Sequence, residues 1–146
     1  MHAFRHAFTV DADIDRVWGF YTDVGHLEVV TPKRLKLKVE RSTTGEKLQE
    51  GTELWISAQL VTRSTWHSRI IRLAPYTYVD EMLEGKFPHW KHTHVFRKTE
   101  SGTEILDEIE LLLPYGALGR MFEGYAGKQL SRIFKYRKDA TINALR

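Results

Sequence analysis

The sequence predicts an α+β protein in which a curved antiparallel sheet of six to seven strands wraps around a long C-terminal helix. Strand-like alternation of apolar and polar residues runs through residues 2–10 and most of residues 34–113. Helical spacing is confined to residues 14–30 and to the chain from Leu118 onward. A sheet with one apolar face needs a cover, which the long helix supplies, and a sheet of this size curls because its strands twist.

The first 32 residues predict one strand and two short helices. Phe4, His6, Phe8 and Val10 alternate with smaller or polar residues, so residues 2–10 form a strand. Residues 11–13 then supply an N-cap, and apolar residues at helical spacing extend the helix to about residue 23. Gly25 breaks that helix, and a second short helix over residues 26–30 ends at Thr31-Pro32.

Six further strands are expected, over residues 34–40, 53–60, 65–73, 76–84, 87–98 and 103–113. The breaks between them carry turn residues, such as Gly45, Ala74-Pro75, Gly85 and Gly102. Short connections between consecutive strands indicate an antiparallel meander. The basic run at residues 33–38 alternates with apolar residues, and we interpret it as the solvated face of a strand rather than a phosphate-binding stripe.

The C-terminal segment has the pattern of one continuous helix from Leu118 to the end of the chain. One face has three-four spacing and carries Leu118, Met121, Phe122, Tyr125, Gln129, Leu130, Ile133, Phe134 and Arg137. Three glycines, at positions 119, 124 and 127, lower the helix propensity of its first half. They are either sites of close approach by another element or a ligand, or simply tolerated.

Composition narrows the classes of function. The 146 residues fit one domain, 1–146, and a net charge of +3 spread along the chain does not indicate nucleic-acid binding. The absence of cysteine excludes disulfides, thiol catalysis and cysteine-ligated metals. No stretch has the length of a signal-peptide core or a membrane span, so we expect a cytoplasmic protein.

The most informative stretch is the strand containing Trp90, His92, His94 and Phe96. These side chains occupy alternate positions and therefore share one face, whereas the opposite face carries Lys91, Thr93, Val95 and Arg97. The face with Lys91 and Arg97 is the more polar, so the face with the two histidines should point inward. Two histidines beside two large aromatics suit the wall of a ligand cavity better than a dry core.

The hairpin that follows adds a carboxylate to this face. With residues 99–102 as its loop, His94 lies opposite Asp107, and His92 lies opposite Ile109. Asp107 is then the one acidic residue on the inward face of its strand, and a buried carboxylate requires a partner. The pair is either a polar group in the wall of an apolar pocket, with a proton-transfer role, or a structural hydrogen bond without a ligand.

Metal binding is a further alternative, with His92, His94 and Asp107 as ligands. A His-x-His pair without another nearby ligand is a weak signal, and His89 has the opposite parity. We therefore expect no metal and no cofactor. Trp66 should also face inward, whereas the direction of Tyr78, Asp80 and Met82 stays open because Val79 and Leu83 on the other face are equally apolar.

The ordered series of motifs resembles the START/Bet v 1-like (SRPBCC) superfamily, and within it the ligand-binding proteins labelled polyketide cyclase/dehydrase-like. The resemblance covers essentially the whole chain and rests on Val17-Trp18-x-Phe20-Tyr21-x-Asp23, Trp66, Asp80, Trp90-x-His92-x-His94-x-Phe96, Asp107, Pro114-x-Gly116 and Phe134-x-Tyr136-Arg137. It implies a helix-grip fold with a deep cavity between sheet and helix that holds lipids, polyketides or aromatic compounds. It implies no particular reaction.

Two functions follow as hypotheses. The first is binding of a small hydrophobic ligand in a cavity lined by Trp66, Asp80, Trp90, His92, His94, Phe96, Asp107, Phe122 and Tyr125. The second is a cyclase or dehydratase in which His94 is the general acid/base, Asp107 orients it and His92 polarises a carbonyl. A third alternative is a homodimer formed through exposed Trp55 or Tyr76.

Overall fold

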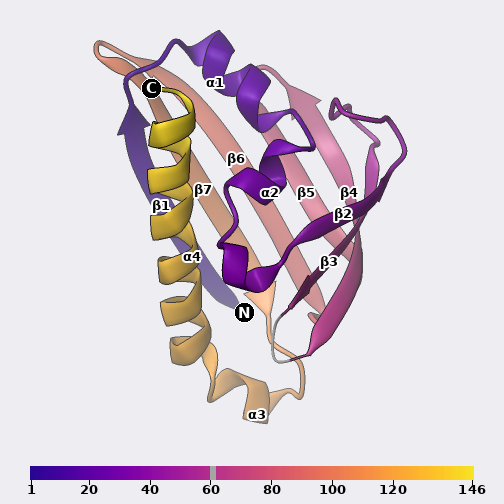
Figure 1. Ribbon diagram of the computed structural model, residues 1–146. Helices are drawn as coiled ribbons and strands as arrows, with labels where there is room; N and C mark the ends of the chain where they lie inside the picture. The colour runs from indigo at the N-terminus through magenta and orange to yellow at the C-terminus, as the bar shows by residue number, and fades with distance from the viewer. Residues whose placement is uncertain (60–61) are drawn as a thin grey trace.

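Seven antiparallel strands form one curved sheet in the order β1-β7-β6-β5-β4-β3-β2 (Figure 1). The computed structural model describes residues 1–59 and 62–146. The strands are β1 (His2–Val10), β2 (Lys38–Ser42), β3 (Glu53–Gln59), β4 (Arg63–Ala74), β5 (Thr77–Glu84), β6 (His89–Thr99) and β7 (Gly102–Leu112). The helices are α1 (Ile14–Tyr21), α2 (His26–Val29), the 3-10 turn η1 (Lys33–Leu35), α3 (Ala117–Arg120) and α4 (Glu123–Ala144). This is the predicted α+β helix-grip architecture.

The structure of residues 1–32 matches the sequence expectation closely. The Asp13 carboxylate accepts a hydrogen bond from the Asp15 backbone N–H at 3.0 Å, and so caps α1. The helices α1, α2 and α4 lie on the concave side of the sheet, with α4 running alongside β1 (Figure 1). Among the described residues, no helix combines the length and the apolar character needed to cross a membrane.

The strand expected over residues 34–40 is wrong in its first half. Residues 33–35 form η1, which Lys36 closes in a left-handed conformation with φ 45°, and β2 begins only at Lys38. Leu35 is buried, so the alternation of this segment reflects one anchoring side chain and not a strand face. The basic run is therefore a turn followed by a strand. The expected neighbouring strand ended at Leu60, which lies outside the described residues.

The prediction of a single C-terminal helix is also wrong, because the helix is interrupted at Met121 and Phe122, between α3 and α4. Leu118 and Met121, expected on a buried face, are 56% and 78% exposed. Gly119 allows the chain to turn tightly from the sheet into α3. A Cβ at this position would collide with the Pro114 carbonyl oxygen.

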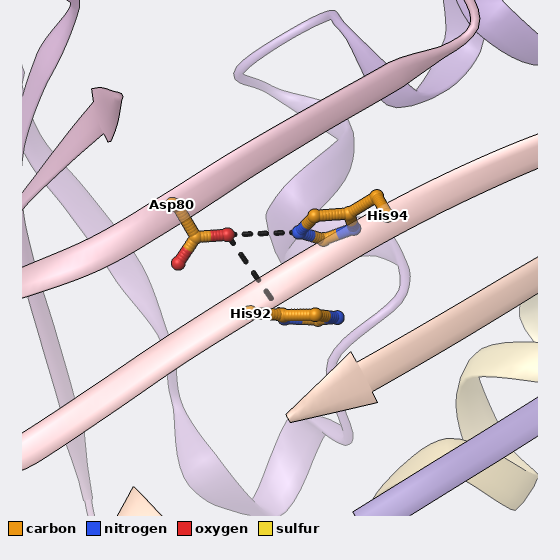
Figure 2. A group of neighbouring side chains, drawn as sticks. All are labelled: Asp80, His92 and His94. Carbon is orange, nitrogen blue, oxygen red and sulfur yellow. Dashed lines mark hydrogen bonds and ion pairs between the residues drawn. The ribbon is translucent and has the colours of Figure 1, made fainter. Parts of the chain in front are cut away.

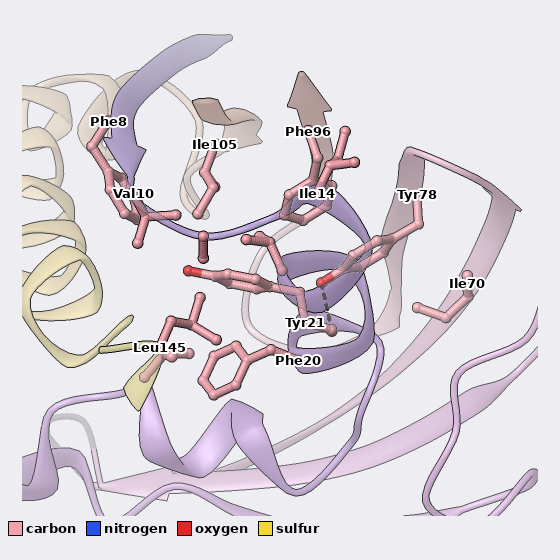
Figure 3. Close-up of a cluster of buried hydrophobic side chains, with 13 residues drawn as sticks. Phe8, Val10, Ile14, Phe20, Tyr21, Ile70, Tyr78, Phe96, Ile105 and Leu145 are labelled. Carbon is pink, nitrogen blue, oxygen red and sulfur yellow. Dashed lines mark hydrogen bonds between the residues drawn. The ribbon is translucent and has the colours of Figure 1, made fainter. Parts of the chain in front are cut away.

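Two apolar clusters anchor the helices to the sheet. The larger one packs α1 and the C-terminal Leu145 against β1, β5, β6 and β7 (Figure 3), and consists of Phe8, Val10, Ala12, Ile14, Val17, Phe20, Tyr21, Val30, Ile70, Tyr78, Phe96, Ile105 and Leu145. The second joins Leu130 and Phe134 of α4 to Ile109 and Leu111 of β7.

The pairing of β4 with β5 is irregular at two places that bend the sheet. It shifts between His67 and Ser68, where β5 has the extra residue, and again between Ile70 and Arg72, where β4 has it. Bulges of this kind increase the local twist of a strand. Ser68 and Ile70, which are buried, lie between the two shifts, so the bend falls where the sheet curves over the helices.

Trp55 and Tyr76, expected as exposed contacts for a homodimer, are both half-buried. The Trp55 ring lies between the Arg41 guanidinium, 4.7 Å from its centroid, and the His67 ring, stacked at 4.2 Å. The Tyr76 hydroxyl donates a hydrogen bond to Asp15 at 2.7 Å. Both aromatic side chains therefore already have partners within the chain.

Gly102 should be essential to the β6–β7 hairpin. Its φ is +151°, and a Cβ would collide with the Val10 carbonyl oxygen, so Gly102→Ala should lower the free energy of unfolding by more than about 1 kcal/mol. Urea unfolding would measure the change. Gly19→Ala is the control, since Gly19 is helical and has open space around it; it should be neutral or stabilising by up to about 1 kcal/mol. Equal stability of the two variants would contradict the argument.

Candidate functional site

A cavity of about 680 Å³ lies between the concave face of the sheet and the helices. Its walls are largely apolar and come from α1, α2, α4 and strands β3 to β7. Seven of the residues predicted from the sequence line it: Trp66, Asp80, Trp90, His92, His94, Phe122 and Tyr125. The fold therefore brings together predicted side chains that are up to 59 positions apart in the sequence, from Trp66 to Tyr125.

Two predicted lining residues lie elsewhere. Phe96 is buried in the larger apolar cluster, where its ring packs against Trp18 and Tyr21. Asp107 is fully buried and lies behind the two imidazoles instead of on the cavity surface. Both share the inward face of the sheet with the lining residues, because alternation specifies a face but not what covers each position along it.

The direction of β5, which the sequence left open, follows from its register. Asp80 is paired with His92 and Tyr78 with His94, so Tyr78, Asp80 and Met82 face the cavity. Asp80 is thus a second inward acidic residue of the sheet, beside Asp107, which is the one acidic residue on the inward face of β7. Its carboxylate remains 23% exposed, whereas that of Asp107 is inaccessible.

The β6–β7 register was predicted correctly, with His94 opposite Asp107 and His92 opposite Ile109. The hydrogen bonds, however, run diagonally. Oδ1 of Asp107 lies 2.8 Å from Nε2 of His92 and 3.3 Å from Nδ1 of His94. His94 instead makes its shortest contact with Asp80, 2.8 Å from Nε2 to Oδ2 (Figure 2). Asp107 is therefore a partner of His94, as predicted, but it lies closer to His92, which was expected beside apolar Ile109 alone.

The two imidazoles are stacked on each other, with ring centroids 3.6 Å apart and an interplanar angle of 24°. The Tyr78 ring continues the stack on His94 at 3.9 Å. This packing holds both rings in the cavity wall. The polar cluster, defined here as Asp80, His92, His94, Asp107 and Arg137, is thus built on rigid strands and a helix rather than on loops.

Arg137 of α4 completes the polar cluster and was missed as a site residue. Its Nη2 lies 3.4 Å from both Oδ1 of Asp107 and Nδ1 of His94, and the guanidinium packs over the Tyr21 ring at 4.8 Å. The sequence did put Arg137 on the buried face of the helix. A cation within an apolar helical stripe was the available signal, since such a residue needs a buried partner.

The electrostatics favour two ionised carboxylates. Burial alone would raise the pKa of Asp107, but Arg137 and the hydrogen bonds from both histidines hold this pKa well below its usual value. Burial likewise opposes ionisation of Asp80, whereas the contacts with His94 and His92 lower its pKa overall. Burial, together with the neighbouring His94, lowers the pKa of His92 despite the nearby Asp107. The His92 ring is accordingly neutral near pH 7.

One end of the cavity is open. Phe122 and Tyr125 line it and yet are 55% and 65% exposed, because they lie at the break between α3 and α4. The other end is closed by the larger apolar cluster around α1. The polar cluster therefore lies on an inner wall, with an apolar opening beyond it.

Comparison with solved structures identifies the fold. A protein of Thermus thermophilus superposes with a TM-score of 0.76 at 16% identity, over 99% of this chain and all of that chain. A START superfamily protein of Mycobacterium smegmatis gives a TM-score of 0.71 at 11% identity, over 99% of this chain and 97% of that chain. The chain has the START fold.

A third structure of this fold carries a named activity. The ZhuI aromatase/cyclase of Streptomyces sp. R1128 gives a TM-score of 0.68 at 18% identity, over 99% of this chain and 90% of that chain. No family model matches the chain, and no curated protein matches it either. Within the START fold, the chemistry of this chain must therefore be argued from its own residues.

Removing the Asp107 charge should be costly. Asp107→Asn leaves the buried Arg137 guanidinium without its carboxylate, and we expect a loss of about 3–5 kcal/mol in unfolding free energy by urea denaturation. Glu104→Gln, on the same strand, removes the carboxylate of an exposed pair with Arg97 and should cost less than about 1 kcal/mol. A similar loss in both variants would show that Asp107 is not a structural counter-ion.

Proposed function

We propose that this protein binds a small hydrophobic or aromatic molecule, of the lipid or polyketide-like class, in the cavity between the sheet and α4. The observation that carries the proposal is the cavity itself, an apolar space of about 680 Å³ with one polar cluster in its wall. This volume is within the range of about 300–1,000 Å³ typical of small-molecule sites. Side chains that merely filled a core would leave far less space.

The lining suggests how such a ligand is oriented. Trp66 and Trp90 offer large aromatic surfaces, and aliphatic residues of β3 and α4 cover the remaining wall. Asp80, His92, His94 and Arg137 of the polar cluster all line the cavity at the inner wall. A ligand with a polar group at one end and an apolar body would place the first against the polar cluster and the second toward the opening.

The fold comparisons support the same class of ligand by analogy. One of the similar structures is an aromatase/cyclase, and another is a START superfamily protein. With identities of 11% and 18%, this similarity concerns the fold, so the residues of the cavity remain the main argument.

A cyclase or dehydratase that uses the same cavity is the second candidate. It is favoured by the contacts of His94, whose two ring nitrogens lie 2.8 Å from Asp80 and 3.3 Å from Asp107 while the ring lines the cavity. Such a histidine can transfer a proton to or from a bound molecule, with the carboxylates fixing its orientation. Here His94 would act as general acid/base.

Mass spectrometry separates the two candidates. The ligand that co-purifies with the protein would be released, identified and incubated again with fresh protein. Recovery of the unchanged molecule supports a binding protein. Loss of one water, or a cyclised isomer, that disappears in His94→Gln supports the enzyme. A chain that purifies without ligand and binds no apolar probe contradicts both candidates.

Filling the cavity should abolish binding without unfolding the protein. Ala126 lines the cavity on α4 and is half-buried, so Ala126→Trp should weaken binding of the neutral fluorescent probe N-phenyl-1-naphthylamine at least about tenfold. Ala144→Trp, at an exposed position near the end of the same helix, is the matched control. Fluorescence titration would measure both, and equal affinities would mean that the probe binds outside the cavity.

A further inference from the structure

Three side chains in the cavity wall bring potential metal-ligand atoms close together. Asp80, His92 and His94 each offer one nitrogen or oxygen atom, and these three atoms lie within 4.8 Å of one another (Figure 2). Oδ2 of Asp80 is 2.8 Å from Nε2 of His94 and 4.0 Å from Nδ1 of His92. In the sequence, the His-x-His pair has no further ligand nearby, and for this reason we expected no metal. The register of β5 supplies that ligand.

Asp107 fixes the orientation of the His92 ring. An ionised Asp107 can only accept hydrogen bonds, so Nε2 of His92, 2.8 Å away, carries the ring hydrogen, and Nδ1 of His92 is a free lone pair 4.0 Å from Oδ2 of Asp80. In His94, Nε2 donates a hydrogen bond to Oδ2 of Asp80 at 2.8 Å. A metal ion would take the place of this hydrogen, which would move to Nδ1 of the same ring, 3.3 Å from Asp107.

A metal ion at this point would meet the lone pair of His92 and the ionised Asp80 carboxylate directly. The polar cluster contains two carboxylates against one guanidinium, so it has a net charge of −1 when both imidazoles are neutral. Asp107 behind the rings repeats an arrangement common in metal sites, in which a buried carboxylate accepts hydrogen bonds from metal-binding histidines and fixes their tautomers.

We propose that Asp80, His92 and His94 form a binding site for a divalent transition metal of the zinc class, with a free coordination position that faces the cavity. Two imidazoles and one carboxylate suit zinc, cobalt, nickel or iron, whereas magnesium and calcium prefer oxygen ligands. Three protein ligands leave a fourth position for water or for an oxygen atom of a cavity ligand. The site goes beyond the proposed function, which requires no metal.

The geometry needs only small adjustments. Metal–ligand bonds of about 2.0–2.2 Å in a tetrahedral site separate ligand atoms by roughly 3.3 Å. The His92–Asp80 distance of 4.0 Å must therefore shorten, and the His94–Asp80 distance of 2.8 Å must lengthen. The carboxylate of Asp80, which is partly exposed to the cavity, has room to move in this way.

Titration of tag-free protein with Co²⁺ tests the proposal, with visible absorption and calorimetry as readouts. We expect one Co²⁺ per chain, a visible spectrum of low-coordinate cobalt, and displacement by Zn²⁺. Asp80→Asn should weaken binding by more than the roughly 10–100-fold that loss of a carboxylate behind a ligating histidine costs. His94→Gln should have the same effect. Circular dichroism would verify that each variant is folded.

Two matched substitutions serve as controls. Glu81→Gln removes the neighbouring carboxylate of the same strand, and His89→Gln removes a histidine of β6 that pairs with Glu110 instead. Both should bind Co²⁺ like the wild type. Absence of stoichiometric binding to the wild type, or wild-type affinity in folded Asp80→Asn, would overturn the metal site. Binding of N-phenyl-1-naphthylamine, measured on the same variants, tests the proposed function separately.

Discussion

The inward face of the sheet depends on one carboxylate, Asp107, which is fully buried in the central part of β7. A charge in such surroundings is tolerated only when opposite charge and hydrogen-bond donors surround it. Arg137 supplies the charge from α4, and His92 supplies the shortest hydrogen bond from β6. The same atom, Oδ1, therefore connects the helix to two adjacent strands, and it fixes where along the sheet α4 must lie.

This arrangement makes the cavity asymmetric. Apolar clusters fill the space around α1 and between α4 and β7, whereas the space between them stays open and is bounded on one side by the polar cluster. Stacked rings of Tyr78, His94 and His92 form a flat aromatic surface whose edge nitrogens reach the two carboxylates. An apolar molecule thus meets a wall that combines aromatic contact with directional polar groups.

Much of this could be predicted because alternation along a strand is a strong signal and hairpin register follows from loop length. These rules sufficed to pair His94 with Asp107 across β6 and β7. They left the direction of Asp80 open, because Val79 and Leu83 are as apolar as the residues on its own face and the irregular pairing of β4 with β5 is not visible in the sequence. They failed at Phe96, whose burial depends on how α1 covers the sheet. The prediction of one continuous, buried C-terminal helix was wrong for a different reason. Three-four spacing indicates which side chains share a helix face, but not whether another element covers that face.

The interruption between α3 and α4 has a kinetic meaning. In a fold closed by one unbroken helix, a guest molecule would have to wait for many side chains to leave the sheet together. Here the opening at Phe122 and Tyr125 already exists in the resting chain, while Leu130 and Phe134 stay packed on β7 further along. Association of the proposed ligand would then be limited by diffusion and orientation, and its residence time by how well it fits the cavity.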